Sequence, residues 1–164
     1  DDPVLFLEHK GLYRQGFAAT KEPDENHVLP FGIGKKIMEG SIVTVISWGA
    51  MVQKSIEAIN MLEIDSGTID LIDLRTLNPI DHEMIGESVK KTGKILVVHE
   101  DNKMNGPGAE ISAHIAENYF DDLDAPIMRV ASIDSHIPYN WHLEEKILVQ
   151  TEDIQKALKE LLEY

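Results

Sequence analysis

Histidine and carboxylate side chains directly follow one apolar run of this 164-residue sequence. His99, Glu100 and Asp101 come after residues 95–98, which are all apolar and resemble a buried strand. Imidazole titrates near neutrality, so it can serve as an acid, a base or a metal ligand. We therefore expect at His99 either a chemical site or a histidine that orders the loop after the strand.

Two further segments follow apolar runs. Arg75 could hold a carboxylate ligand through two parallel hydrogen bonds, or it could form a structural ion pair with Asp73 or another acid. Residues 47–49 (Ser-Trp-Gly) stand between a strand and a helix, where free backbone N–H groups can bind a phosphate. One glycine falls far short of a nucleotide-binding motif, so we expect a tight turn with a packed Trp.

Other residue types narrow the chemistry. His136 and His142 flank a Pro-containing loop at a spacing that fits no metal motif, and we expect the aromatic residues between them to pin the loop onto the core. Cysteine is absent, which excludes disulfides, thiolate nucleophiles and Cys-ligated metals.

Strands and helices alternate in the predicted order of elements. The apolar periods predict strands over residues 4–8, 42–46, 69–74, 95–98 and 127–130, and helices over 51–63 and after 106–108. Asp81 is expected to cap a helix that Gly93 ends, and Thr151 to cap the last helix. Residues 10–31 show no period and are predicted to be a connector.

This alternation predicts an α/β fold with a parallel sheet covered by helices on both faces. Ligands of such sheets bind beyond the carboxyl ends of the strands. One interpretation is therefore a self-sufficient small enzyme or ligand-binding domain that uses a crevice around His99, Glu100 and Arg75.

The charge balance disfavours two classes of partner. Fifteen Lys and Arg stand against 29 Asp and Glu, a net charge of −14, which disfavours nucleic acids and anionic membranes. An acidic cluster at residues 121–124 is either a solvated face or a surface that attracts a basic protein. No apolar run approaches the roughly 20 residues of a membrane span, and the start without Met predicts a processed chain or an excised fragment.

Several strings occur together in a familiar order. They are FLEHK (6–10), LYR (12–14), VISWGA (45–50), IDLRTLNP (72–79), SVKKTG (88–93), GAEI (108–111) and LDAP (123–126) ahead of RV (129–130). Together they resemble the carboxyl-terminal part of the β subunit of thiamine-dependent 2-oxo acid dehydrogenases, which oxidise pyruvate or branched-chain 2-oxo acids. Pro107 departs from the family's usual glycine-rich loop at residues 105–110.

The resemblance implies an organisation in three parts. Residues 1–10 would be the last strand of a preceding pyrimidine-binding domain, 11–31 a connector, and 32–164 a transketolase C-terminal-like α/β domain with three layers and a mostly parallel five-stranded sheet. The family's catalytic residues lie in the preceding domain, and thiamine diphosphate and Mg²⁺ are held with the α subunit. No catalytic residue therefore transfers, no cofactor is expected on this chain, and the fragment alone is expected to be inactive.

The resemblance also implies partners. They are the α subunit or α half, a second β subunit, and the small basic subunit-binding domain of the lipoyl acyltransferase. Asp124 and the terminal Tyr164 with its carboxylate match the family's docking positions, although Asp124 could equally be a turn residue before Pro126. We expect a branched-chain substrate, with pyruvate or acetoin as alternatives, and a location in the bacterial cytoplasm or, in a eukaryote, the mitochondrial matrix.

Overall fold

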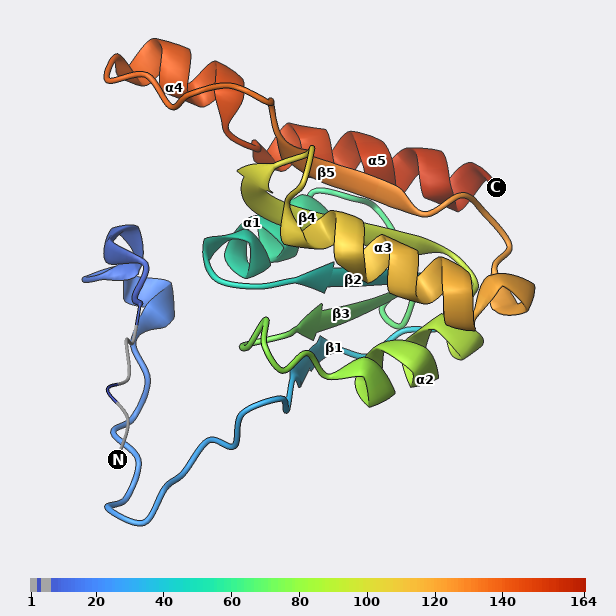
Figure 1. Ribbon diagram of the computed structural model, residues 1–164, viewed down its shortest axis with the longest axis horizontal. Coiled ribbons are helices and arrows are strands. Elements are labelled where there is room, and N and C mark those ends of the chain that lie inside the picture. The colour runs from blue at the N-terminus through green and yellow to red at the C-terminus, as the bar shows by residue number, and fades with distance from the viewer. Residues whose placement is uncertain (1–2, 4–6) are drawn as a thin grey trace.

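A five-stranded sheet forms the centre of the computed structural model, which describes Pro3 and residues 7–164 (Figure 1). The strands lie in the order β1-β3-β2-β4-β5, and all are parallel to their neighbours except β1, which is antiparallel to β3. Their bounds are β1 Lys35–Met38, β2 Val43–Ser47, β3 Ile69–Asp73, β4 Ile95–Asn102 and β5 Met128–Ser132. The mostly parallel five-stranded sheet is thus confirmed. The strand predicted over residues 4–8 falls mainly on residues 4–6, which lie outside the described residues.

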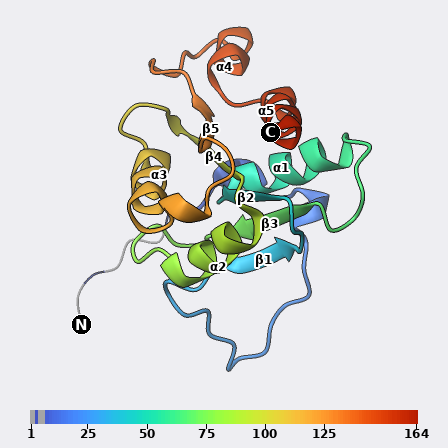
Figure 2. The same cartoon turned by 90° about the vertical axis from the view of Figure 1, so that its right-hand side faces the viewer.

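Helices cover both faces of the sheet and make three layers (Figure 2). Helices α1 and α5 pack on one face, and α2 and α3 on the other. The α-helices are α1 Ala50–Asn60, α2 His82–Thr92, α3 Pro107–Asn118, α4 Trp141–Ile147 and α5 Thr151–Glu163, and the 3₁₀ turns are η1 Lys10–Leu12, η2 Gly16–Ala18 and η3 Phe120–Asp122.

Side chains that point alternately to the two faces of the sheet form two separate hydrophobic cores. Every residue of β2 is buried, as are the first five of β4, because parallel strands between two helical layers meet no solvent. Successive side chains point to opposite faces. The core on the α1 and α5 side includes Val43, Val45, Leu71, Leu96 and Val98, and the core on the α2 and α3 side includes Ile46, Ile72, Ile95 and Val97.

Two of the predicted helix ends are confirmed. The Asp81 side chain accepts a hydrogen bond from the Met84 backbone N–H at 3.0 Å and so caps α2. Gly93 ends that helix in the left-handed conformation, with φ of 65°.

The predicted cap of α5 is wrong. Thr151 is already helical, and the residue before it, Gln150, is the N-cap. The Gln150 carbonyl accepts from the backbone N–H of the third helical residue, Asp153, at 3.1 Å, and the Asp153 carboxylate in turn accepts the Gln150 backbone N–H at 2.9 Å. This reciprocal pair satisfies two backbone donors, which the Thr151 hydroxyl could not do from inside the helix.

Three features were not predicted from the residue pattern. Strand β1 is a half-exposed edge strand that begins with two lysines, so it lacks an apolar period. Helix α4 has seven residues and no buried side chain. Strand β4 continues through its polar end to Asn102, opposite Ser132 of β5, and this places His99 inside the strand rather than after it.

One buried carboxylate joins three elements at the β1 side of the sheet. Asp70 of β3 is fully buried, 2.9 Å from Nζ of Lys36 on β1 and 3.0 Å from Nζ of Lys91 on α2. It also accepts hydrogen bonds from the Ser88 hydroxyl and, at 3.1 Å, from the Gly40 backbone N–H. Burial alone would raise the pKa of Asp70, but these donors outweigh it and lower the pKa below its usual value.

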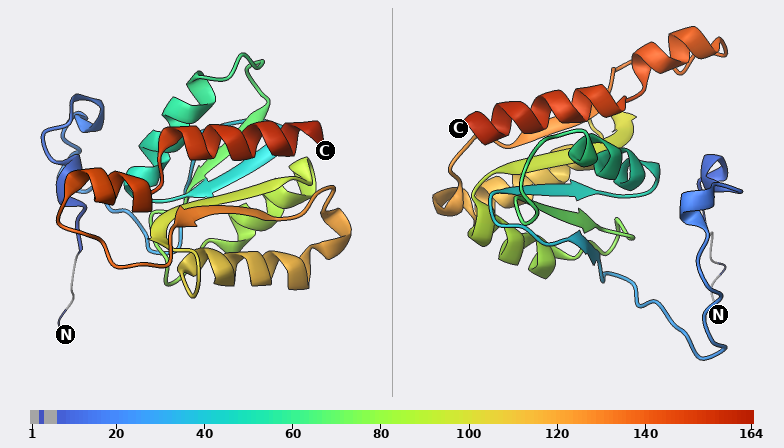
Figure 3. Two further views of the ribbon diagram at one scale, coloured as in Figure 1. Left: turned by 90° about the horizontal axis from the view of Figure 1, so that it is seen from above. Right: turned by 180° about the vertical axis from the view of Figure 1, so that it is seen from behind.

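The segment before β1 runs outside the sheet (Figures 1 and 3). Its residues from Leu7 to Phe31 are almost all exposed, and its early part lies toward the carboxyl ends of the parallel strands. His9 Nε2 lies 3.1 Å from Oε2 of Glu100, which follows His99 in β4. Within the described part of the chain, no helix is both long and apolar enough to cross a membrane.

Removal of the Asp70 carboxylate should destabilise the fold. We expect Asp70→Ala to lower the free energy of unfolding by about 3 kcal/mol, because breaking a buried ion pair from one side leaves buried polar groups unpaired. Urea unfolding at pH 7 measures this. The exposed Glu63→Gln serves as a charge-matched control and should change the value by less than about 0.5 kcal/mol.

The pH dependence of the same variant gives a second check. A carboxyl group whose folded pKa is lowered stabilises the protein above its unfolded pKa of about 3.9, and this stabilisation is lost as the pH falls through the lower folded pKa. The difference between wild type and Asp70→Ala should therefore be full at pH 7 and shrink below about pH 4. A difference that grows toward low pH would contradict a lowered pKa.

Candidate functional site

His99 lies near the carboxyl ends of the strands but is sealed from solvent. Its side chain is 0% exposed, and its ring stacks on Trp48 with ring centres 5.4 Å apart and planes 7° apart. Gly106 and Gly108, at the start of α3, close the other side: a Cβ on Gly108 would lie 2.4 Å from Nε2 of His99. Neither ring nitrogen has a hydrogen-bond partner among the described residues.

These surroundings keep the imidazole neutral. Burial lowers the pKa of His99, although the nearby Asp101 acts in the opposite direction. A neutral ring that no solute can reach is poorly placed for acid–base catalysis. The geometry therefore supports a histidine that orders the β2–α1 and β4–α3 turns against each other.

The residues that could have formed a crevice with His99 are engaged elsewhere. Glu100 faces His9 in the segment before β1. Arg75 is exposed, and its backbone N–H donates to the Asp73 carboxylate at 3.0 Å. Across the described residues, no ion pair forms between the Arg75 guanidinium and Asp73, and no hydrogen bond joins the side chains of His99, Glu100 and Arg75.

The turn after β2 is the tight one expected. Gly49 caps α1 with φ of 58°, a conformation that favours glycine, and no side chain caps this helix start. Trp48 packs beside it on His99, and the Ser47 hydroxyl donates to the Val98 carbonyl at 3.1 Å.

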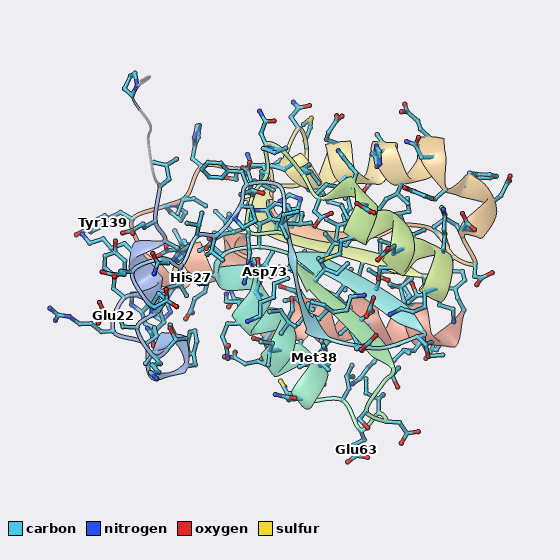
Figure 4. The ribbon with its side chains drawn as sticks, turned by 90° about the horizontal axis from the view of Figure 1, so that it is seen from below. Glu22, His27, Met38, Glu63, Asp73 and Tyr139 are labelled. Carbon is cyan, nitrogen blue, oxygen red and sulfur yellow. The ribbon has the colours of Figure 1, made fainter. Side chains whose placement is uncertain are left out.

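The expectation for the loop between His136 and His142 is wrong. Tyr139 is fully exposed and Trp141 is 57% exposed, so the aromatic residues do not pin the loop onto the core. Helix α4 projects away from the sheet (Figure 1), and Tyr139 lies on the same side of the molecule as Glu22 and His27 (Figure 4). In the described part of the chain, no group of three or more His, Asp or Glu side chains could hold a metal.

A different set of residues gathers at the opposite edge, where the parallel strands begin. Asp124 precedes β5 and is exposed, and Tyr164 ends α5 and is 61% exposed. Both segments lie at the amino-terminal edge of the sheet, which faces the viewer in Figure 2. The Asp124 backbone N–H donates to the Gly93 carbonyl at 2.8 Å, which fixes the carboxylate against the end of α2.

An apolar hollow adjoins Asp124. It has a volume of about 480 Å³, and besides Asp124 it is lined by Ala116, Phe120, Leu123, Ala125, Pro126 and Ile127. Phe120 on its rim is 72% exposed. No hydrogen bond or ion pair from another described side chain reaches the Asp124 carboxylate, so it is available to a partner. The sequence predicts Asp124 as a docking residue but not the hollow beside it, because η3 and the β4–β5 connection form this hollow only in the fold.

Comparison with known proteins identifies the domain. The family model described as "Transketolase, C-terminal domain" matches residues 32–154. The chain belongs to this family. It is also similar over nearly its whole length to β subunits of 2-oxo acid dehydrogenases.

Three such relatives illustrate the similarity. The mitochondrial pyruvate dehydrogenase E1 component subunit beta of Dictyostelium discoideum is 40% identical over 97% of this chain and 45% of its own length. The 2-oxoisovalerate dehydrogenase subunit beta of Bacillus subtilis is 39% identical over 100% of this chain and 50% of its own length. The pyruvate dehydrogenase E1 component subunit beta of Staphylococcus epidermidis is 40% identical with the same coverage. The chain thus spans about half the length of these relatives.

Solved structures agree on the fold. A split-gene transketolase described as an inactive β4 tetramer superposes with a TM-score of 0.71 at 26% identity, covering 88% of this chain and 46% of the other. A 2-oxoglutarate:ferredoxin oxidoreductase from Magnetococcus marinus gives a TM-score of 0.52 at 15% identity, over 79% of this chain and 19% of the other, which shows the shared fold alone.

The tight seal of His99 yields a prediction. Gly108→Ala should lower the free energy of unfolding by about 1–3 kcal/mol, because the added methyl group overpacks a ring that has no free space. In a His99→Ala background the same substitution should cost clearly less, so the two should couple in a double-mutant cycle. Urea unfolding of the four proteins measures both costs.

Gly16→Ala is the matched control, because a Cβ there meets no atom within 4 Å. Its effect should be the same with and without His99. Equal costs of Gly108→Ala in both backgrounds would show that the imidazole does not press on Gly108.

Proposed function

We propose that this chain is the C-terminal assembly and docking domain of the decarboxylating component of a 2-oxo acid dehydrogenase complex. The parent reaction would be oxidative decarboxylation of a 2-oxo acid, with transfer of the acyl group to a lipoyl acyltransferase. Support comes from about 40% identity to β subunits over the whole chain. A branched-chain substrate is our first choice and pyruvate or acetoin the alternatives, although relatives of the first two kinds are equally similar.

The proposal assigns thiamine diphosphate and Mg²⁺ to other parts of the parent enzyme. Within the described residues, no cluster of three potential ligands could hold Mg²⁺. The His99 pocket is filled by packed side chains, and the net charge of −14 would repel a diphosphate. The residues present do not fit the cofactor, so we derive no catalytic step on this chain.

Asp124 carries the docking proposal. Its fixed position beside an apolar hollow, at the same edge of the sheet as the exposed end of α5, suits a small basic partner, the subunit-binding domain of the lipoyl acyltransferase. Arg and Lys of such a partner would form charge-assisted hydrogen bonds with Asp124, and Tyr164 would contact the same partner. The surrounding acidic side chains would speed the encounter.

The opposite edge supports the assembly proposal. Large apolar side chains are exposed there in the segment before β1 and around α4, namely Tyr13, Phe17, Leu29, Phe31, Ile133, Ile137, Tyr139, Trp141 and Leu143. Exposed apolar surface of this extent is typical of an interface. We propose that the preceding domain, the α subunit and a second β subunit cover it, in the bacterial cytoplasm or the mitochondrial matrix.

Calorimetric titration with the acyltransferase subunit-binding domain tests the docking proposal. We expect binding that weakens as salt rises, because exposed charges are screened. Asp124→Asn should weaken it at least tenfold, a loss of about 1.4 kcal/mol. The same titration with Tyr164→Ala measures the contribution of the end of α5.

Two controls separate docking from general effects. Glu22→Gln removes one negative charge at the far end of the molecule (Figure 4) and should leave the dissociation constant unchanged. His99→Ala, provided that its circular dichroism shows a folded protein, should also leave docking unchanged, whereas it would abolish activity if the chain were a self-sufficient enzyme. If Asp124→Asn and Glu22→Gln weaken binding equally, net charge rather than a docking site at Asp124 explains the affinity.

A further inference from the structure

Two histidines meet across the seam between α2 and α3. His82 is the first residue of α2 and His114 lies on α3, and their ring centres are 3.8 Å apart with planes at 37°. One turn further along, the absence of a side chain on Gly86 admits Tyr119, since a Cβ there would lie 2.2 Å from the Tyr119 hydroxyl. This close packing holds the two helices, and with them the two imidazoles, in register.

One nitrogen of the pair has no partner. Nε2 of His114 is buried from solvent and makes no hydrogen bond with any described residue. Its other ring nitrogen, Nδ1, lies 3.3 Å from the Asn118 amide, which also donates to the His114 carbonyl at 2.8 Å. A buried imidazole nitrogen without a partner is costly unless a further group satisfies it.

The charges around His82 and His114 favour a bound cation. Burial and the neighbouring His82 lower the pKa of His114, although Glu117 and Glu110 act in the opposite direction, so its ring is neutral at pH 7 and carries one nitrogen lone pair. Glu110 and Glu117 bring negative charge from α3 itself. The nearby cation on α2, Lys90, lies over the Tyr119 ring at 5.4 Å from its centre.

We propose that His82 and His114 form a binding site for a divalent transition-metal ion such as Zn²⁺, clamping α2 to α3. Imidazole is a preferred ligand of Zn²⁺, Cu²⁺ and Ni²⁺, with metal–nitrogen distances near 2.0–2.1 Å for zinc. Two such bonds to one ion at a tetrahedral angle place the nitrogens about 3.4 Å apart. Rings already in contact reach this spacing by rotation of the exposed His82 side chain.

Coordination through Nε2 of His114 moves its proton to Nδ1. The Asn118 amide, which lies beside Nδ1, can turn so that its oxygen accepts that proton's hydrogen bond, as partners of metal-bound histidines do. Since no third metal-ligating side chain joins this pair in the described residues, water would complete the coordination. The site is independent of the docking proposal, because it lies on the helical face rather than at the sheet edge.

Zinc titration of the untagged full chain tests the site. Calorimetry at pH 7.5 should show one Zn²⁺ bound per chain, and saturation should raise the melting temperature, since an ion that binds the folded state stabilises it. His82→Ala and His114→Ala should each weaken zinc binding at least tenfold, in line with the loss of a metal ligand. Circular dichroism of each apo variant confirms that the fold persists.

The control is the double variant His136→Ala with His142→Ala. His142 also stacks on an aromatic ring, Trp141, at 3.5 Å, but it lies on α4 away from the seam. Its loss should leave the zinc affinity and the zinc-induced rise in melting temperature unchanged. The proposal is overturned if no zinc binds at micromolar concentration, or if binding survives in both His82→Ala and His114→Ala.

Discussion

The buried Asp70 carboxylate is the constraint on which the antiparallel side of the sheet depends. Strand β1 is short, half-exposed and lysine-rich, so hydrophobic burial alone gives it little reason to join β3. The Asp70 carboxylate holds β1 in place through Lys36 and the Gly40 backbone N–H. The same carboxylate also binds Ser88 and Lys91 of α2. A charge buried in this way is tolerated only when every donor is in place, so the network permits one register of β1 and one position of α2.

Residue patterns predicted the parts of the fold that depend on neighbours along the chain. Apolar strands and the Asp81 and Gly93 helix ends follow from spacing, because each needs only local hydrogen bonds or a single period. The sequence places His99 next to its strand but does not show whether solvent or a ligand can reach the imidazole. Its seal comes from Gly106, Gly108 and the distant turn after β2, and no local pattern shows which of these will pack on the ring. Strand β1 was missed for the related reason that tertiary contacts stabilise it, and α4 because its seven residues bury no side chain and so show no apolar period.

The two edges of the sheet differ in character. At the carboxyl ends, where ligands of open α/β sheets bind, the turns close over His99 and large apolar side chains are exposed on either side. At the amino-terminal edge, the Asp124 carboxylate and a small apolar hollow are exposed. A fold whose usual ligand edge is occupied by packing is suited to assembly, and this agrees with a domain that covers half of its relatives' length.

The turn that joins Gly93 to Asp124 has a consequence for the kinetics of any complex formed at this edge. The carbonyl of the left-handed glycine that ends α2 also accepts the Asp124 backbone N–H, so the backbone at Asp124 is already ordered before any partner arrives. Little conformational entropy is then lost in binding. A partner attracted by charge to a rigid edge would associate close to the rate of electrostatically steered diffusion. Partners bound at this edge would therefore exchange without unfolding or remodelling of the domain.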